Sequence, residues 1–398
     1  MMRTCTRLFR FLVGIVVCSC FALSGAVAQT STHLLITNDD DPPGFPIPRI
    51  NTVSFYQIEP QGSLGFKSTL KTGGNGIGGG YFGANRIVEL NVGKQQCIFI
   101  SEATTGDVVG IAANTETVTG SATGSVNDTG TSNGIGLAMN SQYLFANFTD
   151  SSNIGTFQVQ PGCLLTFVGD LTVVGLKGGF VDAMAVHGNT LITTYGDGSI
   201  ESFDISGGIP VSHGDKQFST AANISQGATY PSSIDITRDG RFAIFGDTST
   251  LMAVEVSDIS SGKLAKTVAY QSAGTISASN ILLSPDETML YVSNTQGDRV
   301  TALFFNKGTG KVLSGCTSNS LKGYSVNWSY LGSMALQTNT GNGGGLYVAE
   351  YGSTSGIAMI TMTVSGNTCT LTEAANSPAA DPNTTGLLSI GNFPPRSF

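Results

Sequence analysis

The sequence predicts an all-β fold, a seven-bladed β-propeller, from three observations. Seven short apolar segments each close on a polar residue or a tyrosine, and they recur at intervals of roughly fifty positions, the repeat length of propeller blades rather than of helical solenoids. The chain has 52 glycines and only 12% charged residues, a composition typical of many short strands joined by turns. Apolar and polar residues alternate with the period of two that half-buried strands require.

The seven repeated segments set the order of the blades along the chain. They read LLITN, IFISE, YLFAN, LITTY, AIFGD, LYVSN and LYVAE, and they end at Asn38, Glu102, Asn147, Tyr195, Asp247, Asn294 and Glu350. We expect each to be the second strand of a blade, because an apolar innermost strand precedes the later ones, as at 232–237 and 279–284. Further alternating strands follow, such as 52–58 and 64–70 in the first blade and 299–305 in the sixth.

The first blade has no innermost strand before its second strand. The segment 386–391, which reads GLLSIG, lies near the other end of the chain and has the pattern of such a strand. We therefore predict that 386–391 completes the first blade and closes the ring. Closure of this kind hides the strand edges that an open sheet would expose.

The N-terminal residues predict a secretory signal rather than part of the fold. Arg3, Arg7 and Arg10 precede an apolar run over 11–23, and the small residues 26–28 form a cleavage site. The run is shorter than the roughly 20 residues that span a bilayer. We expect residues 1–28 to be removed and 29–398 to form one domain, secreted or periplasmic and monomeric. Cys20 leaves a lipoprotein as the alternative.

Net charge restricts the class of partner. The formal charge is −8, and the pI is about 4.8. Nucleic acids and anionic membranes attract clusters of Lys and Arg, so we exclude both as partners. The sequence after the signal also contains no segment that is long and apolar enough to span a membrane.

Four cysteines remain after the signal: Cys97, Cys163, Cys316 and Cys369. An even number in an oxidising compartment indicates disulfides, although four cysteines allow three pairings. We prefer Cys316 with Cys369, from adjacent blades, which leaves Cys97 with Cys163. Four buried thiols are the alternative. No Cys and His cluster with the spacing of a zinc site is present.

Three stretches resemble a known family. The sequence at 284–313, SPDETMLYVSNTQGDRVTALFFNKGTGKVL, resembles the bacterial 6-phosphogluconolactonases and related YVTN-repeat, lactonase-like proteins, and so do NTVSFYQIEPQGSL at 51–64 and SSIDITRDGRFAIFGD at 232–247. The resemblance implies a seven-bladed propeller and a lactone hydrolase. The family has a histidine-bearing innermost strand, and the nearest stretch here, GGFVDAMAVHGNTLITTY, retains Asp182 without a histidine pair; His187 comes several residues later.

The ends of the seven repeated segments form the main candidate site. If all seven strands end at one face near the axis, Glu102, Asp247 and Glu350 would converge with Asn38, Asn147, Asn294 and Tyr195. Such oxygen ligands suit Ca²⁺ or Mg²⁺, and a carboxylate held there can act as a general base. The simpler interpretation of each residue is the closing of a hairpin by bonds to local backbone.

A second candidate is the acidic run that follows the first segment. Asp39, Asp40 and Asp41 repel one another unless a cation or Arg49 compensates their charge. An exposed, solvated loop is the simpler interpretation, but loops on a rigid scaffold are where ligands usually bind.

Two functions follow from these candidates. The first is binding of a small molecule, glycan or protein at the face that carries the strand ends, since a fold alone does not imply a reaction. The second is lactone hydrolysis, in which Asp182, Glu102 or Glu350 would activate water and Arg86 or Arg238 would stabilise the oxyanion.

Overall fold

The computed structural model describes residues 33–39, 50–76, 85–124, 135–148, 151–220, 231–247, 252–265, 267–272, 278–294, 299–322, 330–337, 345–351, 356–381 and 389–393. They belong to one compact unit, Thr32–Phe398. The predicted signal segment lies outside the described residues, as do Asp40, Asp41 and Arg49. No helix within the described ranges has the length and apolar character needed to cross a membrane.

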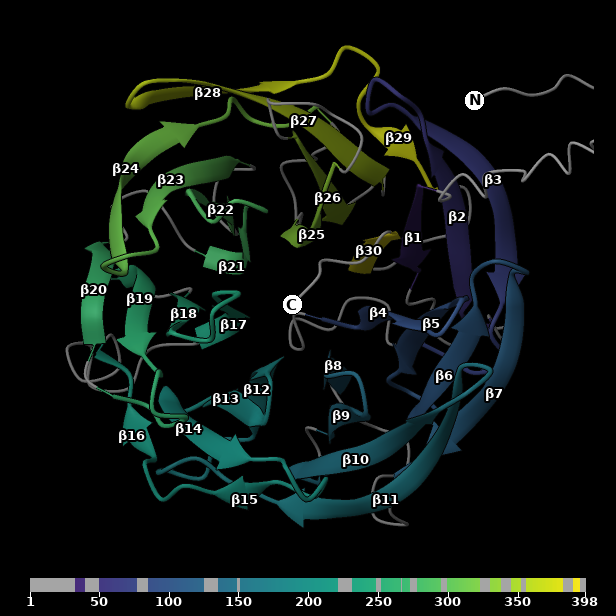
Figure 1. The fold of residues 1–398 in the computed structure, drawn as a ribbon. Coiled ribbons are helices and arrows are strands. Elements are labelled where there is room, and N and C mark those ends of the chain that lie inside the picture. The colour runs from purple at the N-terminus through teal and green to yellow at the C-terminus, as the bar shows by residue number, and fades with distance from the viewer. Residues whose placement is uncertain are drawn as a thin grey trace, which may run out of the picture. The chain divides into compact units, whose positions relative to one another are not determined.

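The described residues form seven antiparallel sheets arranged as the blades of a propeller, which confirms the predicted fold class (Figure 1). We number the blades along the chain. Blade 1 holds β1 to β3 with β30, blade 2 holds β4 to β7, and blade 3 holds β8 to β11. Blade 4 holds β12 to β16, blade 5 β17 to β20, blade 6 β21 to β24 and blade 7 β25 to β29.

Each blade has an innermost strand next to the axis and a second strand beside it. The innermost strands are β30 (Ser389–Phe393), β4 (Ile87–Val92), β8 (Ile135–Met139), β12 (Val181–His187), β17 (Pro231–Ile236), β21 (Ala278–Leu283) and β25 (Tyr330–Leu336). The second strands are β1 (Leu34–Asn38), β5 (Gln95–Glu102), β9 (Tyr143–Phe148), β13 (Thr190–Tyr195), β18 (Phe242–Asp247), β22 (Met289–Asn294) and β26 (Gly345–Tyr351). These are the seven segments that the sequence repeat identified.

The third and outer strands complete each sheet. The third strands are β2 (Thr52–Ile58), β6 (Asp107–Ala112), β10 (Asn153–Gln160), β14 (Ser199–Asp204), β19 (Met252–Asp258), β23 (Val300–Asn306) and β27 (Gly356–Ser365). The outer strands are β3 (Leu64–Lys71), β7 (Thr117–Thr123), β11 (Leu164–Thr172), β15 (Val211–Ser212) with β16 (Gln217–Phe218), β20 (Thr267–Ser272), β24 (Lys311–Thr317) and β28 (Thr368–Glu373) with β29 (Ala379–Ala380).

The last described strand belongs to the first blade. β30 pairs antiparallel with β1, from Leu34 opposite Phe393 to Asn38 opposite Ser389. The strand therefore begins later than the expected 386–391, and residues 386–388 lie outside the described part of the chain. Blade 1 thus draws strands from both ends of the chain, as in the sequence-based expectation.

Packing between neighbouring blades supplies the core. Each of seven buried apolar clusters among the described residues combines side chains of two adjacent blades. In the cluster between blades 7 and 1, for example, Tyr347 and Met359 pack with Leu35, Tyr56 and Ile390. Among the described residues no sheet has a core of its own, so the stability of each blade depends on its neighbours.

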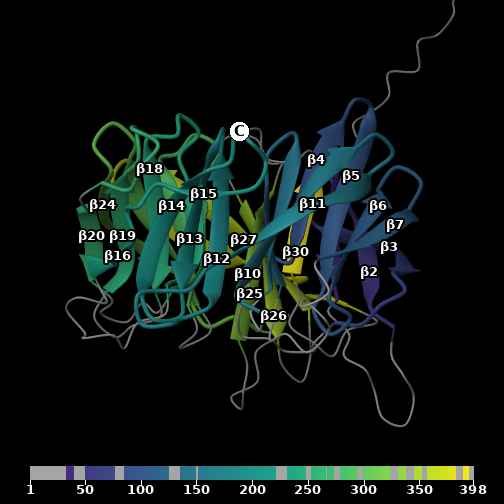
Figure 2. The same ribbon diagram turned by 90° about the horizontal axis from the view of Figure 1, so that it is seen from below.

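Second strands all end at one face of the propeller, which we call the loop face. The strands run roughly along the axis in the side view (Figure 2). Because each sheet is antiparallel, the second-to-third strand connections and the connections to the next blade lie at this same face. The hairpins that join innermost to second strands lie at the opposite face.

Two disulfides link adjacent blades, and both are the preferred pairs. Cys97 of blade 2 bonds to Cys163 of blade 3, and Cys316 of blade 6 bonds to Cys369 of blade 7. Cys97 and Cys163 are fully buried and belong to the apolar cluster between their blades. The bonds therefore reinforce two of the blade interfaces covalently.

Candidate functional site

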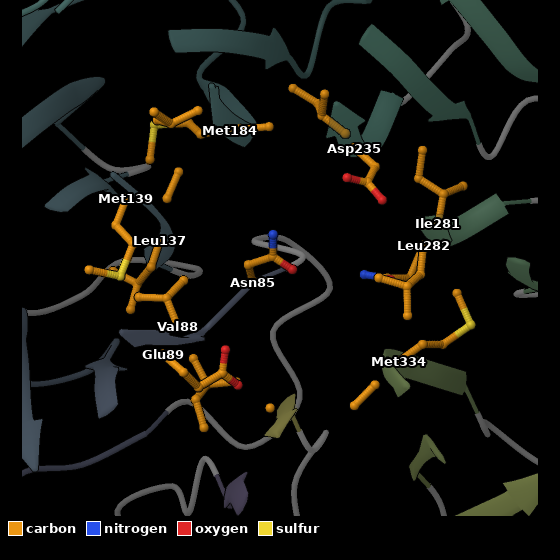
Figure 3. Close-up of a pocket in the computed structure, with 18 of the residues that line it drawn as sticks. Asn85, Val88, Glu89, Leu137, Met139, Met184, Asp235, Ile281, Leu282 and Met334 are labelled. Carbon is orange, nitrogen blue, oxygen red and sulfur yellow. The ribbon is translucent and has the colours of Figure 1, made fainter. Parts of the chain in front are cut away.

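A cavity of about 180 Å³ lies on the axis, where the innermost strands of all seven blades meet (Figure 3). Most of its lining is aliphatic or methionine: Val88, Leu137, Met139, Met184, Ala185, Ile281, Leu282 and Met334 are examples. Methionine side chains adapt their shape to a bound group more readily than branched side chains do. The cavity therefore has the mostly apolar, concave character of small-molecule sites.

Four polar residues also line the cavity: Asn85, Glu89, Asp235 and Asn280. Glu89 and Asp235 lie on opposite sides of it, on β4 and β17 (Figure 3). The Glu89 side chain runs against the backbone of β30, because a Cβ added at Gly391 would lie 1.3 Å from Glu89 Oε1. Glycine at this position is thus required for the approach of the carboxylate.

Asp235 also joins two blades. Its carboxylate accepts the backbone N–H of Ile236 at 2.8 Å and that of Leu283, in blade 6, at 2.7 Å. No Lys, Arg or His occurs among the described residues that line the cavity. The described lining therefore contains two carboxylates and no basic side chain, which disfavours an anionic ligand there.

Sequence reasoning missed this site. The usable signal was an acidic residue inside an innermost strand: Asp235 in the predicted strand 232–237, and Glu89 in IVELNV, which was not among the predicted strands. These strands are otherwise apolar, so a carboxylate on them must face either the axis or a polar partner.

The ends of the second strands do not line the described cavity. Asn38, Glu102, Tyr195, Asp247 and Asn294 are the last residues of their strands, and Asn147 and Glu350 come one residue before the end. All seven are at most 3% exposed, and none is among the described residues that line the cavity. These buried strand ends therefore do not belong to the described lining of the cavity, and their convergence around the channel mouth stays a prediction.

Two of the seven connect their blade to the next one. Asn38 Nδ2 donates to the carbonyls of Arg86 (3.1 Å) and Ser101 (3.0 Å) in blade 2. Asn147 Nδ2 donates to the carbonyl of Val181 in blade 4 at 2.8 Å. Both amides satisfy buried backbone acceptors across a blade interface, which is a structural role.

Replacing Asn147 with aspartate is expected to lower the free energy of unfolding by about 3 kcal/mol. The near-isosteric carboxylate loses the donor to Val181 and places an acceptor against a buried carbonyl. Urea denaturation measures the effect, with the exposed Asn91→Asp as the matched control. A loss no larger than that of the control would contradict the assigned role.

Tyr195 and Asn294 bond within their own blades. The Tyr195 hydroxyl donates to Glu201 at 2.5 Å. Asn294 Nδ2 donates to the Arg299 carbonyl at 2.9 Å and to Thr301 Oγ1 at 3.1 Å. Both contacts secure the connection from the second to the third strand of the blade.

Glu102, the last residue of β5, contacts the segment that connects blade 1 to blade 2. Its Oε1 accepts bonds from Thr72 Oγ1 and from the N–H of Gly74, the latter at 3.1 Å. Gly74 approaches closely, since an added Cβ would lie 1.8 Å from Glu102 Oε2. Burial, and after it the neighbouring Asp107 carboxyl, raises the pKa of Glu102 to about 7, although the Thr72 bond acts in the opposite direction. The side chain therefore titrates near neutral pH.

Asp182 interacts electrostatically with Asp247 of the adjacent blade. Asp182 is fully buried on β12, and neither of its oxygens has a hydrogen-bond partner among the described residues. Burial, and after it the charge of Asp247 on β18, raises the pKa of Asp182 to about 7. Glu350 is also buried, at 1% exposed, in blade 7.

Asp39 is not on an exposed loop, in contrast to the simpler interpretation of the acidic run. It is fully buried and accepts bonds from Thr37, from Thr52 Oγ1 at 2.5 Å and from Ser54 Oγ at 2.9 Å. Three hydroxyl donors replace the water that the carboxylate loses. Burial, and after it the charge of Asp381, raises the pKa of Asp39.

Asp381 connects blade 7 to this group. It directly follows β29, and it accepts the Tyr56 hydroxyl at 2.9 Å and a longer bond of 3.4 Å from Thr37 Oγ1. Residues more than 320 positions apart in the sequence thereby meet between the last blade and the first.

The two predicted arginines lie at opposite faces of the propeller. Arg86 is 2% exposed and immediately precedes β4, where its carbonyl accepts the N–H of Ser101 at 3.1 Å. Arg238 is exposed in the hairpin between β17 and β18, at the face opposite the loop face. The structure therefore does not place Arg238 beside Glu102, Asp182 or Glu350.

Comparisons with known proteins identify the fold alone. No protein-family model matches the chain, and no curated protein matches it in sequence. A putative 6-phosphogluconolactonase from Bacteroides fragilis is similar in structure, with a TM-score of 0.52 and 14% identity over 72% of this chain and 94% of that one. The periplasmic gluconolactonase of Pseudomonas aeruginosa is similar with a TM-score of 0.53 and 14% identity, over 72% of this chain and 83% of that one. A functionally unknown protein from Desulfotomaculum acetoxidans is similar with a TM-score of 0.59 and 14% identity, over 90% of this chain and 99% of that one.

Proposed function

We propose that this chain is an exported binding module whose axial cavity takes up a small ligand with an apolar body and a positively charged group. The observation that carries the proposal is the lining: aliphatic and methionine side chains with carboxylates of Glu89 and Asp235 on opposite sides. The propeller fold supplies a rigid frame for such a site, and lactonase-like proteins are among those that share it.

Cavity size favours a small molecule over a glycan or a protein. An apolar cavity of about 150 Å³ in another protein binds benzene. At about 180 Å³, the cavity here has room for one ring with a short substituent. A glycan or protein partner would have to bind outside the cavity, on the propeller face.

Export is part of the proposal. The arginines, apolar run and small residues of 1–28 have the pattern of a cleaved signal. Two disulfides are consistent with an oxidising compartment, because thiols stay reduced in most cytosols.

The experiment compares three probes of similar shape and different charge: benzylamine, benzyl alcohol and benzoate. A ligand that binds only the native state raises the melting temperature, by mass action. We expect the largest rise in melting temperature with benzylamine, a smaller one with benzyl alcohol and the smallest with benzoate. The reason is that the cavity offers carboxylates and its described lining residues include no basic side chain. Equal shifts for benzylamine and benzoate would contradict the proposal.

Two variants with matched controls test whether the ligand binds in the axial cavity. Ala185→Phe fills the cavity and is expected to abolish the benzylamine shift, whereas Ala265→Phe, at an exposed position, is expected to preserve it. Glu89→Gln is expected to reduce the preference for benzylamine over benzyl alcohol about tenfold, an effect that the exposed Glu59→Gln lacks. A shift that survives Ala185→Phe would place the ligand elsewhere.

Lactone hydrolysis is the second candidate, favoured by the pKa of about 7 that burial gives to Glu102 and Asp182. A carboxylate with such a pKa suits a general base at neutral pH, where its contribution to the rate is typically 10²- to 10⁴-fold. Assays with sugar and acyl lactones, with and without Ca²⁺ or Mg²⁺, decide the question. A turnover of the wild type that falls at least about 100-fold in Glu102→Gln or Asp182→Asn supports a hydrolase. A wild-type turnover equal to that of both variants excludes this function.

A further inference from the structure

The two disulfides differ in their access to solvent. Cys97 and Cys163 are 0% exposed and lie inside the apolar cluster between blades 2 and 3. Cys316 and Cys369 are half-buried and pack against the cluster between blades 6 and 7. A reagent in solution can therefore reach the second bond in the folded protein, whereas the first becomes accessible only when blades 2 and 3 separate.

Cys316 and Cys369 line a pocket at the outside of the propeller, between β24 of blade 6 and β28 of blade 7 (Figure 1). Its volume is about 490 Å³, larger than that of the axial cavity at about 180 Å³. Exposed residues with hydroxyl or amide side chains form much of its described wall: Thr317, Asn319, Ser320, Thr370 and Thr372. The disulfide therefore forms part of the wall of a polar pocket that is open to solvent.

Lys322 and Glu373 give this pocket charges of opposite sign. Glu373 Oε2 accepts the backbone N–H of Lys322 at 2.9 Å, and Lys322 Nζ donates to the carbonyl of Ala374 at 2.7 Å. Glu373 Oε1 is buried and has no hydrogen-bond partner among the described residues. An ammonium group has three N–H donors, of which the bond to Ala374 uses one. A ligand with an ammonium and a carboxylate group is therefore complementary to the pocket.

We propose that this pocket is a site of thiol–disulfide exchange with a small thiol that carries an ammonium and a carboxylate group, as cysteine and glutathione do. The thiolate sulfur of the ligand attacks Sγ of Cys316 or of Cys369, the bond between the two cysteines breaks, and a new disulfide joins the attacked cysteine to the ligand. The other cysteine leaves as a thiolate and takes up the proton that the ligand thiol has released. One disulfide replaces another, so this step involves no net oxidation.

A second ligand thiol completes the reduction. It attacks the mixed disulfide, which leaves two protein thiols and the disulfide of the ligand, so two ligand thiols supply the two electrons. The reaction removes the covalent link between blades 6 and 7 and leaves the link between blades 2 and 3 intact. The folded protein thus has two covalent states that differ at one blade interface.

Peptide mass spectrometry of the folded, full-length protein tests the difference in access. The protein is incubated with cysteine at about pH 8, where part of the thiol is ionised, and is then quenched in acid, alkylated and digested. We expect mixed disulfides and alkylated thiols to appear at Cys316 and Cys369 at least about tenfold faster than at Cys97 and Cys163. Equal rates at the two disulfides, or no reaction at Cys316 and Cys369, would overturn the proposal.

Three thiols of similar size test the recognition: cysteine, N-acetylcysteine, which lacks the ammonium group, and cysteine methyl ester, which lacks the carboxylate. Each rate is divided by the rate of the same thiol with free hydroxyethyl disulfide, which removes differences in intrinsic reactivity. We expect the normalised rate of cysteine to exceed the other two at least about threefold. Equal normalised rates for the three thiols would overturn the proposed site.

Variants of the two charged residues identify the groups that recognise the ligand. Glu373→Gln is expected to remove the advantage of cysteine over N-acetylcysteine, and Lys322→Gln its advantage over the methyl ester. The exposed Lys311→Gln, in β24, is the control and is expected to preserve both. Glu373→Gln keeps an acceptor for the Lys322 N–H, so its melting temperature is expected to match that of the wild type. The outcome is independent of the axial cavity, since the two described linings share no residue.

Discussion

Replacement of both Cys97 and Cys163 by alanine is expected to lower the free energy of unfolding by about 4 kcal/mol. The bond closes a loop between residues 66 positions apart, so its loss restores much conformational freedom to the unfolded chain. Both sulfurs lie in the buried cluster between blades 2 and 3, and smaller side chains also leave a cavity there. The effect weakens the packing of two blades at once.

The matched control is Cys316→Ala with Cys369→Ala. This bond joins residues 53 positions apart, and its cysteines are only partly buried, so a smaller loss of about 3 kcal/mol is expected. Urea denaturation monitored by circular dichroism measures both variants at pH 7. A loss below about 1 kcal/mol for the buried pair would show that packing alone holds blades 2 and 3 together.

Stability is expected to rise, by several kcal/mol, as the pH falls from about 8 to about 5. Burial raises the pKa of Glu102 and of Asp182 to about 7 and raises that of Asp39 as well. In this window the folded protein therefore holds protons that the unfolded chain has released, and the free energy of unfolding falls as the pH increases. Each unit of raised pKa corresponds to about 1.4 kcal/mol.

The trend reverses in stronger acid. Hydrogen bonds lower the pKa of Asp197 and Glu116, whose stabilising contribution is present above their unfolded pKa and is lost as the pH falls through the folded one. Maximum stability is therefore expected between about pH 4 and 5.5. Chemical denaturation at a series of pH values in EDTA measures the curve, and Glu102→Gln is expected to flatten it. Stability that increases steadily from pH 5 to 8 would contradict the assigned burial of these acids.

The repeated pattern predicted the fold because blade geometry depends on local alternation and turns. The segments ending at Asn38 and Asp247 are second strands, as expected, and the two disulfides join the preferred cysteines. The pairing of β30 with β1 could also be predicted, because the sequence shows no innermost strand before the second strand of blade 1.

The sites were harder to predict, because a strand end fixes the face of the ring and not the direction of the side chain. Asn38 and Asn147 face the next blade and bind its backbone, whereas Tyr195 bonds within its own. Asp182 lies at a β-bulge of β12, which has no sequence signature in FVDAMAVH. Glu89 owes its place in the cavity to Gly391, which is about 300 positions away.

Methionine methyl resonances test the central claim, a ligand site on the propeller axis, most directly. Met139, Met184 and Met334 line the cavity, whereas Met359 is buried in the cluster between blades 7 and 1. During a titration with benzylamine, followed by NMR of ¹³C-methyl methionine, we expect the three cavity methyl signals to shift together and saturably, and that of Met359 to stay in place. Cavity signals that do not move, or that move no more than that of Met359, would contradict the account.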